Sequence, residues 1–138
     1  MWLVLINKQI FATCSAIAVQ NNEYYLFGER KDGQGWCFPG GKQEKETIEE
    51  CALRELEEEF DIKRVKLKKI GRLISKAVVK GEIRIVNPML FHTFFLEDEI
   101  KLNTDEYNQF KWIKLDEIDR YRIFAPTKSA IDKLIENL

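Results

Sequence analysis

The 138-residue sequence has few cysteines, a single histidine and no long apolar run, and these shortages exclude whole classes of protein. Cys14, Cys37 and Cys51 are odd in number and have neither CxxC nor any other metal-ligand spacing. They indicate buried thiols in a reducing compartment and argue against a disulfide framework. The apolar N-terminal stretch is interrupted at 7–9, has no basic leader and is too short to span a membrane. We therefore expect a cytoplasmic protein that makes no use of a membrane.

An excess of charge of either sign is also missing. The chain has 22 basic and 23 acidic residues, which give a formal net charge of -1. This balance excludes a general attraction to nucleic acid or to anionic lipid, so a polyanionic substrate would need locally placed cations or a metal ion. Hydrophobic residues make up 45% of the chain, as is typical of globular proteins. The length, with no repeat or linker, predicts one domain over residues 1–138, as a monomer or a homodimer.

Apolar runs separated by turn-forming residues predict a sheet flanked by helices. A short helical turn is expected at 115–121, and an amphipathic helix at 125–138 with Ile131, Leu134, Ile135 and Leu138 on its apolar face. Strands, a helix, more strands and a final helix are typical of an α/β (α+β) fold, a mixed sheet with helices on its faces. The predicted strands cover 10–19, 24–30, 36–42, 65–75, 82–97 and 110–115.

The strongest local signal is a helix beginning after Thr47. Thr47 is a good N-cap, and Glu50 three residues later completes a capping box. The expected apolar stripe recurs every four residues, with one further apolar residue beside it. Its members are Ile48, Ala52, Leu56, Phe60 and the adjacent Leu53.

The same helix carries a dense group of acidic residues in "RELEEEFDI", residues 54–62. At 100° per residue, Glu55, Glu58 and Glu59 fall on one arc of about 100°, whereas Glu57 points elsewhere. A solvated acidic surface is a physically cheap alternative, because exposed carboxylates three or four residues apart repel by only a few tenths of a kcal/mol. Charge alone therefore does not separate a binding site from an ordinary helix surface.

The spacing of these residues resembles the Nudix box, G-x5-E-x7-R-E-U-x-E-E-x-G-U, in which U is an apolar aliphatic residue. The resemblance covers residues 40–62 and lacks only the last glycine, which is Asp61 here. Asp tolerates the left-handed conformation better than most residues, so we expect an intact site. The matching residues are Gly40, Glu46, Arg54, Glu55, Leu56, Glu58, Glu59 and Ile62.

The resemblance implies an α/β/α sandwich that binds Mg²⁺, with Mn²⁺ as the alternative ion. Magnesium takes oxygen ligands and keeps substrate phosphates and waters in its shell. By resemblance, Glu58 and Glu59 are the expected ligands, and Glu55 is either a ligand or the base that orients water. A glycine carbonyl completes the expected set, from Gly40 or from Gly41, because the loop is one residue shorter than in most relatives with "GGK".

The resemblance also assigns supporting roles. Arg54 is expected to hold the carboxylates by charge-assisted hydrogen bonds, and Glu46 to steady the junction between loop and helix. Glu106, six residues before Trp112, matches an additional acidic residue of many relatives and is a candidate ligand or base; a solvated turn residue is the alternative. Arg30 and Lys42 are candidate phosphate contacts, against the alternative of exposed surface cations.

The resemblance implies a metal-dependent hydrolase of a nucleoside diphosphate linked to another group. "FPGGK" in a short chain resembles the MutT branch, which converts nucleoside triphosphates, including oxidised or non-standard ones, to monophosphate and pyrophosphate. Residues 75–82 lack the proline of the ADP-ribose branch, and the tyrosine of the diadenosine-polyphosphate branch is also missing. A nucleotide sugar is the second candidate substrate. A non-catalytic nucleotide-sensing module is the third reading, although such modules often lose the carboxylates that this chain retains.

Overall fold

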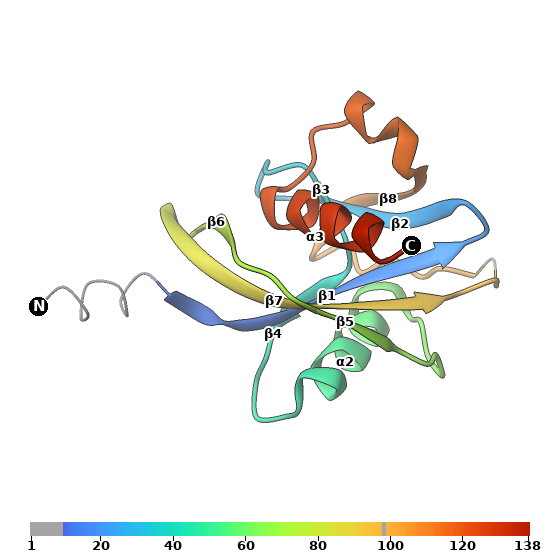
Figure 1. Ribbon diagram of the computed structural model, residues 1–138, viewed down its shortest axis with the longest axis horizontal. Helices are drawn as coiled ribbons and strands as arrows, with labels where there is room; N and C mark the ends of the chain where they lie inside the picture. The colour runs from blue at the N-terminus through green and yellow to red at the C-terminus, as the bar shows by residue number, and fades with distance from the viewer. Residues whose placement is uncertain (1–9, 98) are drawn as a thin grey trace, which may run out of the picture.

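A computed structural model of the chain describes residues 10–97 and 99–138 (Figure 1). The N-terminal stretch 1–9, which we expect to be neither a leader nor a membrane span, lies outside the described residues. The elements are β1 (Ile10–Asn21), β2 (Tyr24–Arg30), β3 (Trp36–Cys37), β4 (Gly40–Lys42), α2 (Ile48–Phe60), β5 (Lys68–Arg72), β6 (Ser75–Val79), β7 (Glu82–Phe94), β8 (Tyr107–Lys114), the 3-10 helix η1 (Leu115–Arg120) and α3 (Ala125–Glu136).

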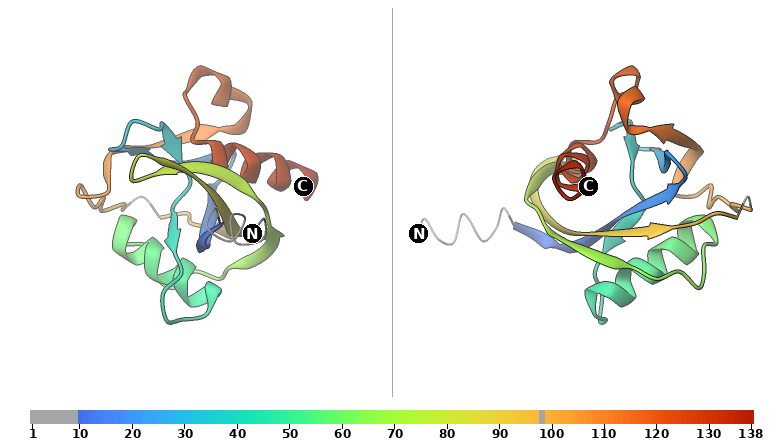
Figure 2. Two further views of the ribbon diagram at one scale, coloured as in Figure 1. Left: turned by 90° about the vertical axis from the view of Figure 1, so that its left-hand side faces the viewer. Right: turned by 45° about the vertical axis from the view of Figure 1, so that its right-hand side comes forward.

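The strands form one mixed sheet with β1 at its centre. β1 runs parallel to β7, with Ile17 opposite Phe91, and antiparallel to β2 and β4. β5 and β6 both pair with β7, and β8 pairs with β2, all antiparallel. Figures 1 and 2 show α2 on one side of the sheet and α3 on the other. The predicted fold, a mixed sheet with helices on both faces, is confirmed.

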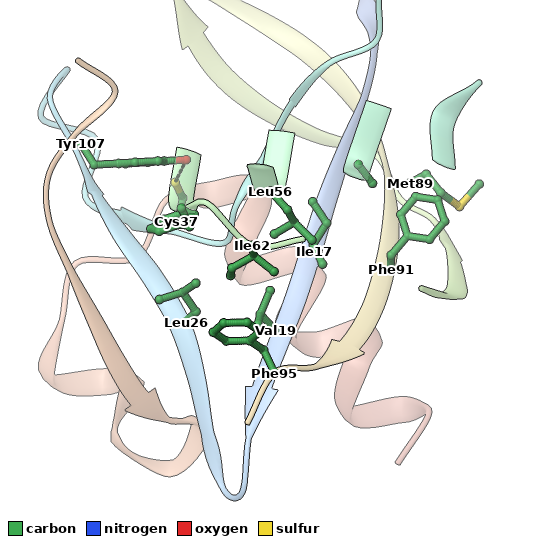
Figure 3. Close-up of a cluster of buried hydrophobic side chains, with 12 residues drawn as sticks. Ile17, Val19, Leu26, Cys37, Leu56, Ile62, Met89, Phe91, Phe95 and Tyr107 are labelled. Carbon is green, nitrogen blue, oxygen red and sulfur yellow. Dashed lines mark hydrogen bonds between the residues drawn. The ribbon is translucent and has the colours of Figure 1, made fainter. Parts of the chain in front are cut away.

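Two apolar cores hold the three layers together, because successive residues of β1 point to opposite faces of the sheet. Ile17 and Val19 are buried in the cluster that contains Leu56 and Phe60 of α2 (Figure 3). Ala18, between them, belongs to the other cluster, beneath α3. Each fully buried Leu, Ile or Phe side chain contributes about 1.5–3 kcal/mol, so the two clusters anchor α2 and α3 firmly to the sheet.

Two features of the predicted strands are wrong. The predicted strands leave residues 76–81 as a connection, but most of this segment belongs to β6, which forms a hairpin with β7 in which Val79 pairs with Glu82. Lys80 and Gly81 both adopt positive φ angles of 51° and 79° in its two-residue turn. The expected strand 36–42 is divided into β3 and β4, because Pro39 between them has no N–H for a strand ladder.

The apolar stripes of the two helices are also narrower than expected. Leu53 of α2 is 38% exposed, Ile135 of α3 is 51% exposed, and Leu138 lies beyond the end of α3 and is exposed. The helices turn Leu53 and Ile135 away from the sheet, while Leu56 and Leu134 fill the cores. Among the described residues, no helix combines the length and hydrophobicity needed to cross a bilayer.

Candidate active site

Both ends of α2 are fixed by local contacts, which sets the position of its carboxylates. The Thr47 side chain accepts the Glu50 backbone N–H, and the Glu50 carboxylate accepts the Thr47 N–H, so the predicted capping box is present. At the other end, Asp61 adopts the left-handed conformation, with φ 56° and ψ 32°. The residue that replaces the motif glycine therefore takes the backbone conformation that a glycine would take.

Glu55 and Glu59 project from α2 onto the two glycines of β4. Glu59 is only 2% exposed, and its Oε1 accepts hydrogen bonds from the Gly40 N–H at 3.1 Å and the Tyr107 hydroxyl at 2.9 Å. Gly41 lies against Glu55 so closely that a Cβ there would sit 2.5 Å from the Glu55 carboxyl carbon. The absent side chain at Gly41 is therefore a condition for the position of Glu55.

Arg54 joins three acidic residues of the motif. Its guanidinium forms a two-point ion pair with Glu46, with the shortest distance 2.7 Å, and reaches Glu55 at 2.8 Å and Glu58 at 3.2 Å. It also donates to the Lys42 carbonyl at 3.1 Å. Arg54 thus ties the β4–α2 loop to the helix, and its hydrogen bond is the main cause that lowers the pKa of Glu46.

The expected convergence of three carboxylates is not found. Glu55 and Glu59 meet, but the Glu58 side chain is 56% exposed and pairs with Arg54. Glu58 lies one helical turn after Arg54, a spacing at which opposite charges on a helix surface pair readily. Glu57 points away from the site, as predicted, with its carboxylate 3.8 Å from the Lys63 amine.

Burial makes the Glu55–Glu59 pair electrostatically strained. Desolvation raises the pKa of Glu59 well above its usual value, and the neighbouring Glu55 raises it further. Desolvation also raises the pKa of Glu55, although Arg54 opposes this effect. A positive charge between the two carboxyl groups would oppose both of these effects.

The donor chemistry of this pair suits a hard divalent cation. Both groups supply carboxylate oxygens, the preferred ligands of Mg²⁺, and the glycine backbone at Gly40 and Gly41 leaves room beside them. In residues 10–97 and 99–138, no group of three or more Asp, Glu, His or Cys side chains converges to hold a metal. Glu55 and Glu59 thus supply two neighbouring carboxylates, and Glu58 would have to turn from Arg54 to complete a set of three.

A polar compartment of about 390 Å³ opens in front of this pair. Both candidate phosphate-binding cations, Arg30 and Lys42, line it, and so does Glu106. The structure thus brings seven of the predicted site residues to one cavity, while Arg54, Glu46 and Glu58 lie outside its lining. The seven are Arg30, Gly40, Gly41, Lys42, Glu55, Glu59 and Glu106.

A smaller, largely apolar compartment of about 150 Å³ adjoins the polar one. The two share Arg30, Gly40, Gly41, Lys42 and Tyr107 as lining residues, so they form one continuous cleft. The remaining walls come from β1, β3, β6, β7 and the start of α3. They include Cys14, Val78, Val86, Pro88, Phe124 and Thr127.

A larger hollow of about 780 Å³ lies elsewhere, lined by residues 61, 63–65, 94–97 and 99–101. Only Asp61 of the motif borders it, and neither a buried carboxylate nor a candidate phosphate-binding cation does. The chemistry of the molecule is therefore concentrated in the smaller cleft, where charge, burial and glycine backbone coincide.

The loop that carries Glu106 is attached to the end of α2. The Asn103 N–H donates to the Glu59 carbonyl at 2.8 Å, and the Lys101 N–H donates to the Phe60 carbonyl at 3.2 Å. Glu106 is exposed, yet it borders the polar compartment. These backbone bonds place the acidic loop residue and the acidic helix residues in a fixed relation.

Tyr107 is a site residue that sequence reasoning missed. It is 4% exposed, and its ring stacks on Phe60 with the ring centroids 5.3 Å apart. It also lies over Gly28, where a Cβ would come within 2.7 Å of the ring. Burial raises the pKa of Tyr107, so its hydroxyl stays protonated and donates to Glu59. The only sequence signal was its place beside Glu106, whereas the contact with Glu59 spans 48 residues.

Comparison with known proteins decides the family. The sequence matches the family model for the NUDIX domain over residues 11–136. The chain belongs to the Nudix family. The Nudix box predicted from spacing lies within this match, and its carboxylates border the cleft or attach to Arg54. The protein is a Nudix hydrolase, a class of enzyme that acts on phosphorus-containing anhydrides.

Solved Nudix structures share the fold at low sequence identity. A MutT NUDIX hydrolase from Burkholderia pseudomallei superposes with a TM-score of 0.76 at 20% identity, covering 89% of this chain and 97% of its own. The NUDIX domain of Shewanella oneidensis NrtR, complexed with ADP ribose, gives 0.75 at 12% identity, with 91% and 87% covered. A C. elegans Ap4A hydrolase gives 0.71 at 19% identity, with 91% and 96% covered. These structures are described as a MutT hydrolase, an ADP-ribose complex and an Ap4A hydrolase, so the shared fold leaves the substrate open.

Proposed function

We propose that this Nudix hydrolase is a Mg²⁺-dependent pyrophosphohydrolase that converts a nucleoside triphosphate to the monophosphate and pyrophosphate. The observation that carries the proposal is the joined cleft, in which a buried carboxylate pair and two cations face a polar compartment beside a single apolar one. A nucleoside triphosphate has the same two parts, a polyanionic chain and one flat, largely apolar ring. Dinucleoside polyphosphates would leave a second base without a matching compartment in this cleft.

The carboxylates would hold the metal. Glu55 and Glu59 supply its oxygens from α2, Glu58 joins them, and the backbone of Gly40 or Gly41 approaches closely because neither has a side chain. When bound, the ion neutralises the phosphates and polarises the attacking water. Mn²⁺ has the same ligand preferences and is expected to replace Mg²⁺.

The remaining charged residues bind and orient the substrate. Arg30 and Lys42 border the polar compartment and bind the phosphate oxygens there. Glu106 lies on the same cavity and is placed to hold the attacking water by a hydrogen bond or to accept its proton. Arg54 acts as a positioning residue because it contacts Glu55 and Glu58, and Glu46 acts through its ion pair with Arg54; both lie outside the cavity lining.

A panel of nucleotides tests the substrate and the site together. Purified protein with Mg²⁺ should release pyrophosphate from at least one nucleoside triphosphate, and chelation should abolish this. Turnover of nucleotide sugars in place of triphosphates would select the second candidate substrate. Binding without turnover would contradict the enzymatic assignment and favour a nucleotide sensor.

The matched pair Glu58→Gln and Glu57→Gln tests the metal site directly. Glu58→Gln removes a proposed ligand and should reduce turnover at least about tenfold to hundredfold, with the protein still folded. Glu57→Gln removes the same charge one residue away, on an exposed side chain paired only weakly with Lys63, and should leave turnover unchanged. Full activity in Glu58→Gln would refute the assignment.

A further inference from the structure

A glutamine side chain connects the two sides of the cleft at the apolar compartment. Gln34 lies in the loop between β2 and β3, and its carboxamide meets the backbone of Val78 in β6. The Val78 N–H donates to Gln34 Oε1 at 3.0 Å, and Gln34 Nε2 donates to the Val78 carbonyl at 2.9 Å. The side chain thus satisfies both backbone groups of Val78, as a neighbouring strand would.

Gln34 is itself held by residues that reach the cleft. Its backbone N–H and its Nε2 both donate to the Asp32 carboxylate, at 3.1 Å and 2.8 Å. Asp32 in turn forms a two-point ion pair with Arg30, with the shortest distance 2.7 Å, and this pairing holds the pKa of Asp32 at about 2. The Arg30 guanidinium lies 4.0 Å from the centre of the Phe124 ring. Arg30, Val78 and Phe124 all line the apolar compartment.

An alternative role for Gln34 is simple protection of the β6 edge, since unpaired strand edges invite aggregation. Edge protection would require only the two bonds to Val78. Edge protection alone does not explain why Gln34 bonds to β6 at the apolar compartment. Val78 and its two neighbours, Ala77 and Val79, all line this compartment. The β6–β7 hairpin forms one wall of this compartment, and Gln34 fastens β6 to the loop that joins Arg30 to β3, whose Arg30 and Cys37 also line it.

We propose that Gln34 is a positioning residue that determines how the enzyme binds the nucleoside part of its substrate. By fixing the distance between β6 and the 31–35 loop, it sets the width of the apolar compartment. We expect the phosphate side to depend on it little, because Asp32 pairs with Arg30 directly and not through the Gln34 side chain. This inference rests on the proposed function, in which the apolar compartment takes the base.

Gln34→Ala tests the proposal, with Gln109→Ala as the matched control. Gln109, on β8, lines neither compartment and has an exposed side chain that donates to Glu29 at 3.2 Å. Loss of the paired bonds to Val78 should raise KM for the preferred triphosphate about threefold to tenfold, with kcat within about twofold. The control should match the wild type in both. Gln34→Glu keeps the acceptor but sets a carboxylate against the Val78 carbonyl, and should raise KM at least as much.

Two inhibitors separate a nucleoside effect from a general one. The inhibition constant of the nucleoside monophosphate product should be higher for Gln34→Ala than for the wild type, by the same factor as KM. Inorganic tripolyphosphate, which has no base, should inhibit the variant and the wild type equally. An unchanged KM, or equal weakening of both inhibitors, would overturn the proposal.

Failure of the proposed function gives a different result. In that case the wild type hydrolyses no triphosphate of the panel, whatever residue 34 is. Calorimetric binding of the nucleoside monophosphate then compares wild type and Gln34→Ala without any turnover. A lower affinity of Gln34→Ala than of the wild type for the monophosphate supports the role of Gln34. Equal affinities, or no binding to either protein, overturn it.

Discussion

Replacing Glu59 with Gln should make the metal-free protein more stable while it removes activity. Glu59 is buried, and the neighbouring Glu55 carboxyl group adds to the rise in its pKa that burial causes. The amide oxygen of Gln can keep the bonds from the Gly40 N–H and the Tyr107 hydroxyl, and its amide nitrogen can donate to Glu55. The variant therefore retains every hydrogen bond of the site and loses only the second negative charge.

The size of the effect follows from the charge pair. Two carboxylates about 4 Å apart repel by roughly 4 kcal/mol at an effective dielectric near 20. Stronger hydrogen bonds to a charged acceptor, relative to a neutral one, offset about 1–2 kcal/mol of this. Retention of a proton by the pair relieves part of the rest. We expect Glu59→Gln to raise the free energy of unfolding by about 1–2 kcal/mol, a shift of roughly 3–6 °C in a domain of this size.

The gain should depend on pH in a defined direction. Because the pKa of Glu59 is raised in the folded state, its contribution to stability is fully present below the unfolded pKa and is lost as pH rises through the folded pKa. Gln does not titrate. The two proteins should therefore differ little near pH 4.5 and increasingly toward pH 8.

Thermal unfolding with and without Mg²⁺ provides the measurement. In EDTA at pH 8, Glu59→Gln should have a higher melting temperature than the wild type. The Glu58 side chain is largely exposed, so the free energy of unfolding of Glu58→Gln should lie within about 1 kcal/mol of the wild-type value. Adding Mg²⁺ at ten times its dissociation constant should stabilise the wild type by about 1.4 kcal/mol and the Glu59 variant much less. A variant less stable than the wild type in EDTA at pH 8 would refute the reasoning.

Two further substitutions test residues around the same site. Tyr107→Phe removes the hydroxyl that donates to buried Glu59 and should lower the free energy of unfolding by about 1–2 kcal/mol, with weaker Mg²⁺-induced stabilisation in the same melting assay; an unchanged Mg²⁺ response would show that the hydroxyl does not position Glu59. Asp61→Gly restores the motif glycine at φ 56° and should raise the free energy of unfolding by about 0.5–1 kcal/mol. Loss of the exposed 3.3 Å ion pair between Asp61 and Lys63 should reduce this gain slightly. The turnover of Asp61→Gly should equal that of the wild type, and a less stable variant would contradict the left-handed strain at Asp61.

The helix and the loop before it were predictable because their determinants are local. The capping box at Thr47, the apolar repeat of α2 and the left-handed Asp61 all lie within fifteen residues of one another. Short-range sequence patterns therefore specify where α2 begins and ends, and which residues it turns toward the sheet. The spacing of the motif then predicted three of the residues that line the polar compartment, Gly40, Glu55 and Glu59.

The rest depends on contacts between distant parts of the chain. β6 is half exposed, and its turn of Lys80 and Gly81 lacks the Asn-Gly or Asp-Gly signal of a tight hairpin. The pairing of Tyr107 with Glu59, and of Gln34 with Val78, joins residues more than forty positions apart. No local pattern encodes these two pairings. The direction of Glu58 is a different case, because its spacing of four residues from Arg54 is itself a local signal for an ion pair, which the helical arc alone did not take into account.

The parallel pairing of β1 with β7 has a consequence for the newly made chain. Cys14 of β1 lies opposite Pro88 of β7, so 74 residues must be added before these partners can meet. At roughly 5–20 residues per second, the ribosome takes about 4–15 s over that interval. During this time β1 can pair only with β2 and β4, and the edge that receives β7 is open to any strand that arrives. We expect nascent chains that end before β7 to be the species most prone to aggregation and most dependent on chaperones.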